Sequence, residues 1–268
     1  MEFFNMFSYH FIQRALIVGV LVSLCAALLG VSLVLKRYSM IGDGLSHVGF
    51  GALAIASAFN LAPLAVTIPV VVAAAVLLLR MSKNGMLKGD TAIAMISSSS
   101  IAIGVVVISL VNGINSELNS YMFGSILSVS RSDAVLSIIL CSAVLVLFLL
   151  LYPRLFAVTF DEDFARATGT NTELYNTLLA ILTAVTVVLG MRMMGALLIS
   201  SLIIFPALSA MRICKSFKAV VISAAAISVF CFVAGMVASY FMESPTGASI
   251  VIANLLVYAI LSAIFIKK

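Results

Sequence analysis

Long uncharged runs, separated by single or paired charged residues, dominate this chain of 268 residues. A helix needs about 20 apolar residues to cross the hydrocarbon core of a bilayer. The second run is long enough for two such helices, and Asn60 and Pro63 near its middle favour a tight turn between them. The sequence therefore predicts nine membrane spans. The uncharged runs cover residues 15–35, 44–79, 91–116, 134–153, 174–191, 193–211, 219–242 and 244–266.

The composition excludes a water-soluble globule. Charged residues make up only 9% of the chain and hydrophobic residues 63%, whereas about a quarter of the residues in an ordinary soluble domain are charged. The spans and their short connections use up the length, so we expect residues 1–268 to form one all-α, polytopic transmembrane domain in a lipid bilayer. The net charge of +5 comes from basic residues scattered between apolar runs, which argues against binding to nucleic acid.

The distribution of basic residues predicts the orientation, because cytoplasmic loops are enriched in Lys and Arg. With nine spans, 12 of the 15 basic residues fall on one side, and only Arg14, Arg131 and Arg192 fall on the other. This places the N-terminus outside and the C-terminus in the cytoplasm. Arg192 lies in a short turn that we expect at Met191–Met194. If that turn is buried, the helices beside it are short or broken and the number of spans is eight.

Two segments between the runs are expected not to span. The outer loop 112–131 contains the uncharged stretch 118–130, which is too short to cross and is predicted to be interfacial or re-entrant, capping the outer mouth. On the cytoplasmic side, residues 152–173 form the longest polar stretch of the chain.

A short helical pattern lies within this cytoplasmic stretch. Asp161, Glu162 and Asp163 stand at its start, where acidic side chains interact favourably with the helix dipole, and Gly169 at its end suits a C-cap. A short amphipathic helix at the inner face would dock a cytoplasmic partner. The alternative is a solvated connecting loop.

Asp43 and His47 are the best candidates for handling a ligand. On a helix, residues four apart lie on one face about one turn from each other. A carboxylate and an imidazole in this arrangement can share a divalent cation such as Zn²⁺, Mn²⁺ or Fe²⁺, and two ligands suit a transit site that must release its ion. The alternative is that Asp43 caps its helix and His47 bonds to a neighbouring helix.

The other polar residues in the apolar runs carry weaker signals. Ser200, Ser201 and Pro206 lie in the span Gly195–Ile213, and a proline-kinked helix there either lines a pathway or is simply curved. No GxxxxGK[ST] motif occurs, so we expect no ATP binding of that kind and no enzymatic activity in this chain. The four cysteines are spaced like small core residues rather than metal ligands.

Five segments together carry a resemblance to a known family. They are VLKRYSMIGDGLSHVGFGALA (34–54), YMFGSILSVSRSD (121–133), FDEDFARATG (160–169), GMRMMGALLISSLIIFPALSAMR (190–212) and SPTGASIVIA (244–253). In this order and spacing they resemble the permease subunits of bacterial ATP-binding-cassette (ABC) importers for zinc, manganese or iron. The resemblance covers nearly the whole chain and implies a vitamin B12-permease-like importer fold in the bacterial cell membrane.

The resemblance also implies roles and partners. Asp43 and His47 match the family's GDxLSH motif and would form the transit metal site. The segment FDEDFARATG matches the family's coupling helix, so Asp161, Glu162, Asp163, Ala165 and Gly169 would fit a groove on the ATPase. The implied partners are a second permease copy, as a homodimer or a dimer of related permeases, two cytoplasmic ATPase subunits and an extracytoplasmic metal-binding protein.

No permanently bound cofactor is expected, and the cargo is a divalent metal. The stretch NSYMFGSILSVS favours zinc, because it looks more like the zinc permeases than the manganese ones; a manganese or iron importer is the alternative. In this hypothesis the loaded binding protein docks on outer loops, where Glu117, Asp133 and Glu243 supply acidic edges. ATP-driven closure then moves the helices at 161–169.

Two other classes of protein stay open from the sequence. A secondary carrier coupled to protons or sodium would have more charged residues at mid-membrane and an inverted internal repeat, which the sequence does not display. A structural or assembly protein of the membrane is the third possibility. Copurification of a nucleotide-binding subunit would distinguish the importer from both.

Overall fold

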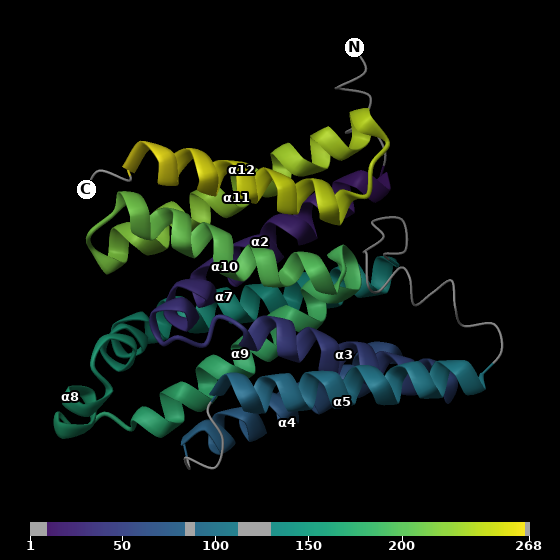
Figure 1. The fold of residues 1–268 in the computed structure, drawn as a ribbon, viewed down its shortest axis with the longest axis horizontal. Coiled ribbons are helices and arrows are strands. Elements are labelled where there is room, and N and C mark those ends of the chain that lie inside the picture. Colours follow the sequence, from purple (N-terminus) through teal and green to yellow (C-terminus); the bar gives the residue numbers. More distant parts are fainter. Residues whose placement is uncertain (1–9, 84–88, 112–129, 266–268) are drawn as a thin grey trace.

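The computed structural model describes residues 10–83, 89–111 and 130–265, and every regular element among them is an α-helix (Figure 1). The predicted all-α class is confirmed for this part of the chain. Within these residues, nine long helices and one short helix follow one another. They are α2 (His10–Leu35), α3 (Ile41–Ala58), α4 (Pro63–Lys83), α5 (Gly89–Leu110), α7 (Arg131–Phe160), α8 (Glu162–Ala167), α9 (Thr172–Met194), α10 (Ala196–Ile213), α11 (Phe217–Met242) and α12 (Thr246–Phe265).

The break predicted inside the long second run is present. The helix α3 ends at Ala58 and α4 begins at Pro63, a residue suited to the first turn of a helix because no backbone N–H is needed there. Between them Asn60 has a φ of 51°, a left-handed conformation that asparagine tolerates. The run 44–79 therefore contributes two helices, as predicted.

The turn predicted at Met191–Met194 was wrong. The helix α9 continues through Met194, and a single residue, Gly195, joins it to α10. Gly195 has a φ of 89°, which a residue without a Cβ adopts at little cost. The chain therefore turns at the glycine and not at the charged residue, and Arg192 lies in the last turn of α9.

Seven helices of the described chain are long and apolar enough to cross a membrane, namely α2, α4, α5, α7, α9, α11 and α12. The helices α3 and α10 have 18 residues each, and the apolar part of α10 is the shorter stretch Leu198–Ile213. The choice between nine and eight spans, and the orientation of the termini, therefore remain predictions.

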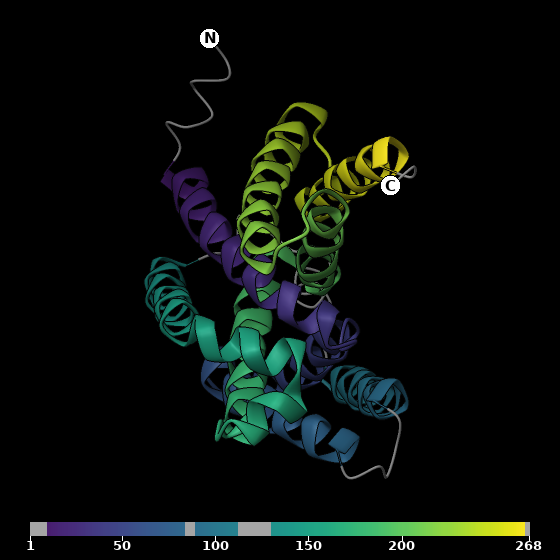
Figure 2. The same ribbon diagram turned by 90° about the vertical axis from the view of Figure 1, so that its left-hand side faces the viewer.

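The helices fall into two groups with a central layer between them. In Figures 1 and 2, α10, α11 and α12 pack together on one side, and α3, α4 and α5 pack together on the other. The helices α2, α7 and α9 lie between these groups. The short helix α8 lies at the left-hand end of Figure 1, beyond the end of the bundle.

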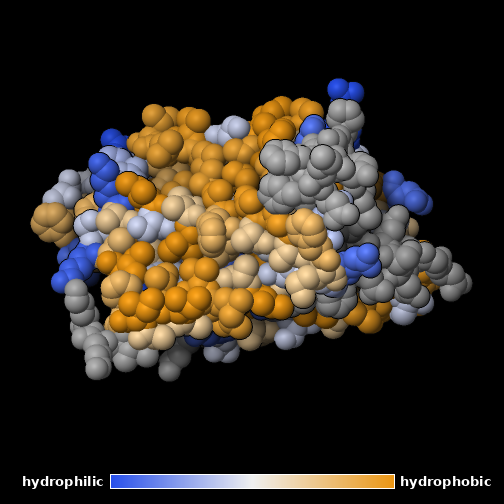
Figure 3. All heavy atoms as spheres, turned by 90° about the horizontal axis from the view of Figure 1, so that it is seen from above, coloured by the Kyte–Doolittle hydropathy of each residue, from blue (hydrophilic) through white to orange (hydrophobic). Residues whose placement is uncertain are grey.

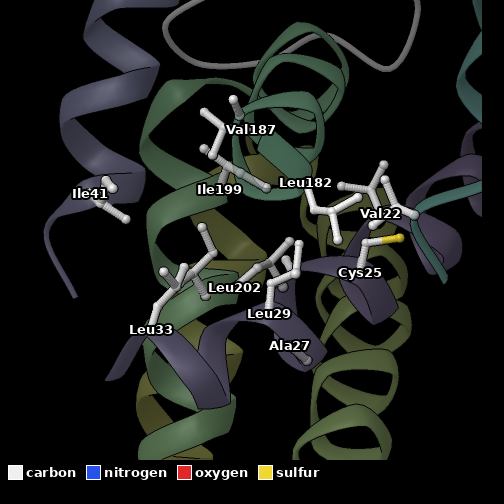
Figure 4. Packing of buried hydrophobic residues seen from close by; sticks show 14 of the residues in the cluster. Val22, Cys25, Ala27, Leu29, Leu33, Ile41, Leu182, Val187, Ile199 and Leu202 are labelled. Atoms are coloured by element: carbon white, nitrogen blue, oxygen red, sulfur yellow. The ribbon is translucent and has the colours of Figure 1, made fainter. Parts of the chain in front are cut away.

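The core is built around α2, which contacts α7, α9, α10 and α11. Side chains of α2 such as Leu29 and Leu33 pack beside Leu202 of α10 and are almost fully buried (Figure 4). Association of helices in a bilayer depends on close packing rather than on hydrophobic burial. Gly30 allows such packing, because the backbone of Ile203 occupies the place where a Cβ would stand.

The surface and the cysteines agree with a membrane-embedded chain. Figure 3 shows hydrophobic residues across the middle of one face and hydrophilic residues towards its two ends. Cys25, Cys141 and Cys231 are buried in the core, and Cys214 is partly buried, which confirms the prediction of small core residues for the first three. The Sγ of Cys25 lies 3.5 Å from the carbonyl oxygen of Cys141, so α2 and α7 bring these two residues together.

Candidate functional site

A tight turn at the end of α2 positions the start of α3. Arg37 has a φ of 62°, and the backbone N–H of Tyr38 donates to the carbonyl oxygen of Leu33 at 2.9 Å. The N–H of Ile41 then donates to the carbonyl oxygen of Tyr38 at 3.1 Å, and α3 begins. The chain thus reverses direction within a few residues.

The first turn of α3 lies inside the bundle. Gly42 packs against the side chain of Ile203, whose Cδ1 would stand 2.7 Å from a Cβ at that position. The same Ile203 packs against Gly30, more than a turn before the end of α2. The start of α3 is therefore level with the interior of α2 and α10 and not with their ends. Figure 1 shows α3 beginning to the right of the left-hand end of α2.

Asp43 and His47 meet on this first part of α3, as predicted. The Nε2 of His47 lies 3.5 Å from Oδ2 of Asp43. The hydroxyl of Ser200 on α10 donates to the other carboxylate oxygen, Oδ1, at 3.3 Å. Asp43 is 36% exposed and His47 23% exposed in the single chain. The site is therefore a polar spot at the depth of the core, open on one side.

The alternative roles of these two residues receive little support. The N-cap of α3 is Met40, which makes no side-chain capping bond, although a carboxylate in the first turn still favours the helix dipole. Within the described residues, His47 pairs with Asp43 and not with a neighbouring helix. The Asp43 backbone oxygen accepts a bond of 2.7 Å from Ser46, which anchors the turn.

This arrangement can hold a cation weakly. It offers one carboxylate, one imidazole and one nearby hydroxyl, donors that suit Zn²⁺ and Mn²⁺. In the described part of the chain, no cluster of three or more His, Cys, Asp or Glu residues could hold a metal. Among the described residues, the carboxylate and the imidazole are therefore the two strong donors at this spot.

Of the three pathway candidates on α10, only Ser200 reaches Asp43. Ser201 is buried, and its hydroxyl donates to the carbonyl oxygen of Leu198 within the same helix at 2.8 Å. Pro206 is buried in the interior of α10. Ser200 therefore faces the site, whereas Ser201 and Pro206 are buried within the packing of α10.

The predicted cytoplasmic helix is present as α8. Asp161 caps it by accepting a bond of 2.9 Å from the N–H of Phe164, and Gly169 follows its end with a φ of 87°. Asp161 and Asp163 are exposed and Ala165 is buried, whereas Glu162 faces the bundle. A helix rather than a solvated loop therefore presents these residues, while their contact with an ATPase remains a prediction.

Phe164 on α8 is 66% exposed and was not among the predicted site residues. An aromatic residue between acidic and basic residues on a polar segment was the available signal, since exposed aromatics mark interaction surfaces. Lys36 is one of the 12 basic residues that predict the orientation, and the structure adds a contact that this count does not reveal: its Nζ lies 3.1 Å from Oε2 of Glu162.

The three outer docking candidates have different environments. Asp133 forms an ion pair of 2.8 Å with Arg192 and accepts a bond of 2.7 Å from Ser130, so its charge is already partnered. Glu243 is exposed, with a φ of 50° at the C-cap of α11. Glu117 lies outside the described residues, as does the stretch 112–129 of the predicted outer loop.

Comparisons with known proteins agree on one family. A family model described as ABC 3 transport family matches residues 8–266. The high-affinity zinc uptake system membrane protein ZnuB of Haemophilus influenzae is 28% identical over 249 residues, covering 92% of this chain and 94% of that protein. The manganese import system permease protein ScaB of Streptococcus gordonii is 29% identical over 252 residues, covering 94% and 90%.

A solved structure has the same fold over nearly the whole chain. It is that of PsaBC from Streptococcus pneumoniae in complex with Fab, with a TM-score of 0.87 and 28% sequence identity. The match covers 97% of this chain and 94% of the solved one.

Proposed function

Because this chain belongs to the ABC 3 transport family, we propose that it is the permease subunit of an ATP-driven importer that carries a divalent transition metal, zinc being favoured, across the bacterial plasma membrane. ATP hydrolysis takes place in separate cytoplasmic subunits, and an extracytoplasmic binding protein delivers the metal. Membership of an ABC transport family argues against a self-sufficient carrier and against a purely structural protein.

The observation that carries the proposal is the polar spot formed by Asp43, His47 and Ser200. It lies at the depth of the bundle core, where ionisable side chains are expensive and mark transport pathways. Asp43 and His47 are two strong ligands, enough to bind a cation but too few to hold it tightly. A transit site needs this balance, since the ion must enter from one side and leave on the other.

The exposure of the site in one chain supports a second copy beside it. A carboxylate that is 36% exposed at this depth would face lipid unless another protein surface covered it. In a two-fold dimer the same patch of each copy meets its equivalent. Two copies of Asp43 and His47 would then face one another and could supply four donors to one ion.

In the proposed mechanism the chain alternates between two access states. Asp43 and His47 hold the metal while the outer side is open, and Ser200 keeps one carboxylate oxygen oriented. Closure of the ATPase subunits moves α8 and opens the inner side. The metal leaves because the second state binds it less tightly, and ATP supplies the free energy for the change.

Fewer observations support the choice of zinc than support the transport of a divalent metal. The relatives named above include one named for zinc and one named for manganese, and the donors at the site suit either ion. We favour zinc because the stretch NSYMFGSILSVS looks more like the zinc permeases, and manganese or iron is the alternative cargo.

The test is ATP-dependent metal uptake by the assembled complex in liposomes, measured separately for zinc, manganese and iron. We expect Asp43→Asn and His47→Ala each to abolish uptake of the preferred metal. Glu173→Gln is the matched control, because it also neutralises one carboxylate, an exposed one in the first turn of α9. Normal uptake of all three metals by Asp43→Asn would overturn the site assignment.

A further inference from the structure

Three side chains, one on α8, one on α9 and one directly after α2, form a closed ring of hydrogen bonds. The Nζ of Lys36 donates to Oε2 of Glu162 at 3.1 Å and also donates to Oδ1 of Asn176. The Nδ2 of Asn176 donates to Oε1 of Glu162 at 3.0 Å, which closes the ring. The Lys36 side chain is only 9% exposed. An ammonium group so enclosed needs its partners, so the ring behaves as one unit.

The ring joins elements that are far apart in the sequence. Two further hydrogen bonds of this segment are local: Phe164 is bonded to Asp161, and Arg166 to Thr172 at the start of α9. The bonds of Lys36 span 126 positions to Glu162 and 140 positions to Asn176. Lys36 therefore ties the cytoplasmic helix to the part of the chain that leads into α3.

A short segment of the chain joins Lys36 to the proposed transit site. The turn after Lys36 is held by the backbone bonds of Tyr38 and Ile41 described above. Side chains of Lys36, Tyr38 and Ile41 line the same small apolar pocket with Asn176. Asp43 follows in the first turn of α3. A displacement of Lys36 would therefore reach Asp43 through a short segment whose turn is held by backbone hydrogen bonds.

We infer that Lys36 is a positioning residue that couples movement of α8 to the transit site, and that the Lys36–Glu162–Asn176 ring is the joint through which this coupling passes. The inference rests on the proposed function and adds to it the side chains that connect the ATPase side to the metal. Glu162 acts in this joint from the inner face of α8, while Asp161 and Asp163 are exposed on the same segment.

The experiment compares metal ions transported per ATP hydrolysed in complexes assembled with the ATPase and the binding protein. We expect Lys36→Met to lower this ratio by about tenfold, within the range of typical allosteric couplings, while basal ATP hydrolysis and subunit stoichiometry stay unchanged. Lys36→Arg keeps the charge and should restore most of the ratio. Arg37→Asn is the matched control, because this neighbouring basic residue is exposed and asparagine tolerates its positive φ.

A second pair of variants keeps the test decisive if Lys36→Met does not assemble. Glu162→Gln should lower the ratio, whereas Glu173→Gln, which removes an exposed charge from the first turn of α9, should not. If Lys36→Met leaves the number of metal ions transported per ATP unchanged, or if the two glutamate variants give equal ratios, the coupling role of Lys36 is refuted and the proposed function stands. A wild-type complex that transports none of the three metals with ATP overturns the proposed function and this inference with it.

Discussion

The contact between Gly30 and Ile203 predicts that one added methyl group weakens the whole bundle. In Gly30→Ala, the new Cβ would stand 3.0 Å from the carbonyl carbon of Ile203 and 3.1 Å from its Cα, and still closer to its carbonyl oxygen. These are backbone atoms, so no side chain can rotate away. The helices α2 and α10 must move apart, and Ile203 would shift against Gly42 at the start of α3.

The size of the effect follows from two opposing contributions. Overpacking of this kind costs about 1–3 kcal/mol, while replacing glycine by alanine inside a helix returns up to about 1 kcal/mol. The nearest atom to the new Cβ would be the backbone oxygen of Ile203, well inside van der Waals contact, so we take the upper part of the overpacking range, about 2–3 kcal/mol. Less about 1 kcal/mol for alanine, Gly30→Ala should lower the free energy of unfolding by about 1–2 kcal/mol, roughly a tenfold fall in the ratio of folded to unfolded protein.

Gly49→Ala is the matched control for this prediction. Its Cβ would also be crowded, at 2.8 Å from Cε of Met191, but that atom is the end of a flexible side chain that can move. We expect this variant to be as stable as the wild type. The assay is unfolding in mixed micelles with increasing sodium dodecyl sulfate, followed by far-ultraviolet circular dichroism because the chain has no tryptophan. Equal midpoints for the two variants would refute the close-approach argument.

Three further predictions concern the ends of the bundle and the site. Arg192→Met should lower the free energy of unfolding in the same assay by about 1–3 kcal/mol, because it removes the cationic partner of the Asp133 carboxylate, which is 19% exposed and keeps only the Ser130 hydroxyl; adding Asp133→Asn should recover much of this loss, and a double variant no better than the single one would argue against the pair. Phe164→Ala should reduce copurification of the ATPase without changing the stability of the permease, because this side chain is 66% exposed; full copurification would remove Phe164 from the contact. Ser200→Ala removes a long hydrogen bond, 3.3 Å, from a neutral hydroxyl to the Asp43 carboxylate. At about 1 kcal/mol, its loss should raise the metal concentration for half-maximal uptake several-fold, whereas Ser201→Ala should leave it unchanged; equal values for the two variants would contradict the assigned role.

Local patterns in the sequence were sufficient for part of this structure. The turn between α3 and α4 follows from Asn60 and Pro63, and the cap of α8 follows from Asp161. The pairing of Asp43 with His47 follows from helical spacing alone. Each of these features is decided by residues within a few positions of one another, so the periodicity of a single helix predicts them.

The rest depends on packing between helices. The depth of Asp43 is set by how closely Gly30 approaches Ile203, and no pattern within α3 contains that information. Glu162 turns inward because Lys36, distant in the sequence, provides a partner. The turn after α9 was misplaced because the charge of Arg192 suggested a surface position, whereas Asp133 neutralises it there.

Because Gly195 alone forms the joint between α9 and α10, α9 can tilt as a rigid helix about this residue. Its far end is held by the joint and by the ion pair of Arg192 with Asp133, while its near end carries Asn176. About 27 Å of helix separates Asn176 from Met194 at 1.5 Å per residue, so a tilt of about 5° moves the near end by about 2 Å and the joint hardly at all. A displacement of this size is large compared with the range of donor–acceptor distances over which a hydrogen bond forms. The Asn176 end of α9 can thus move much farther than its Gly195 end, although the helix keeps its length.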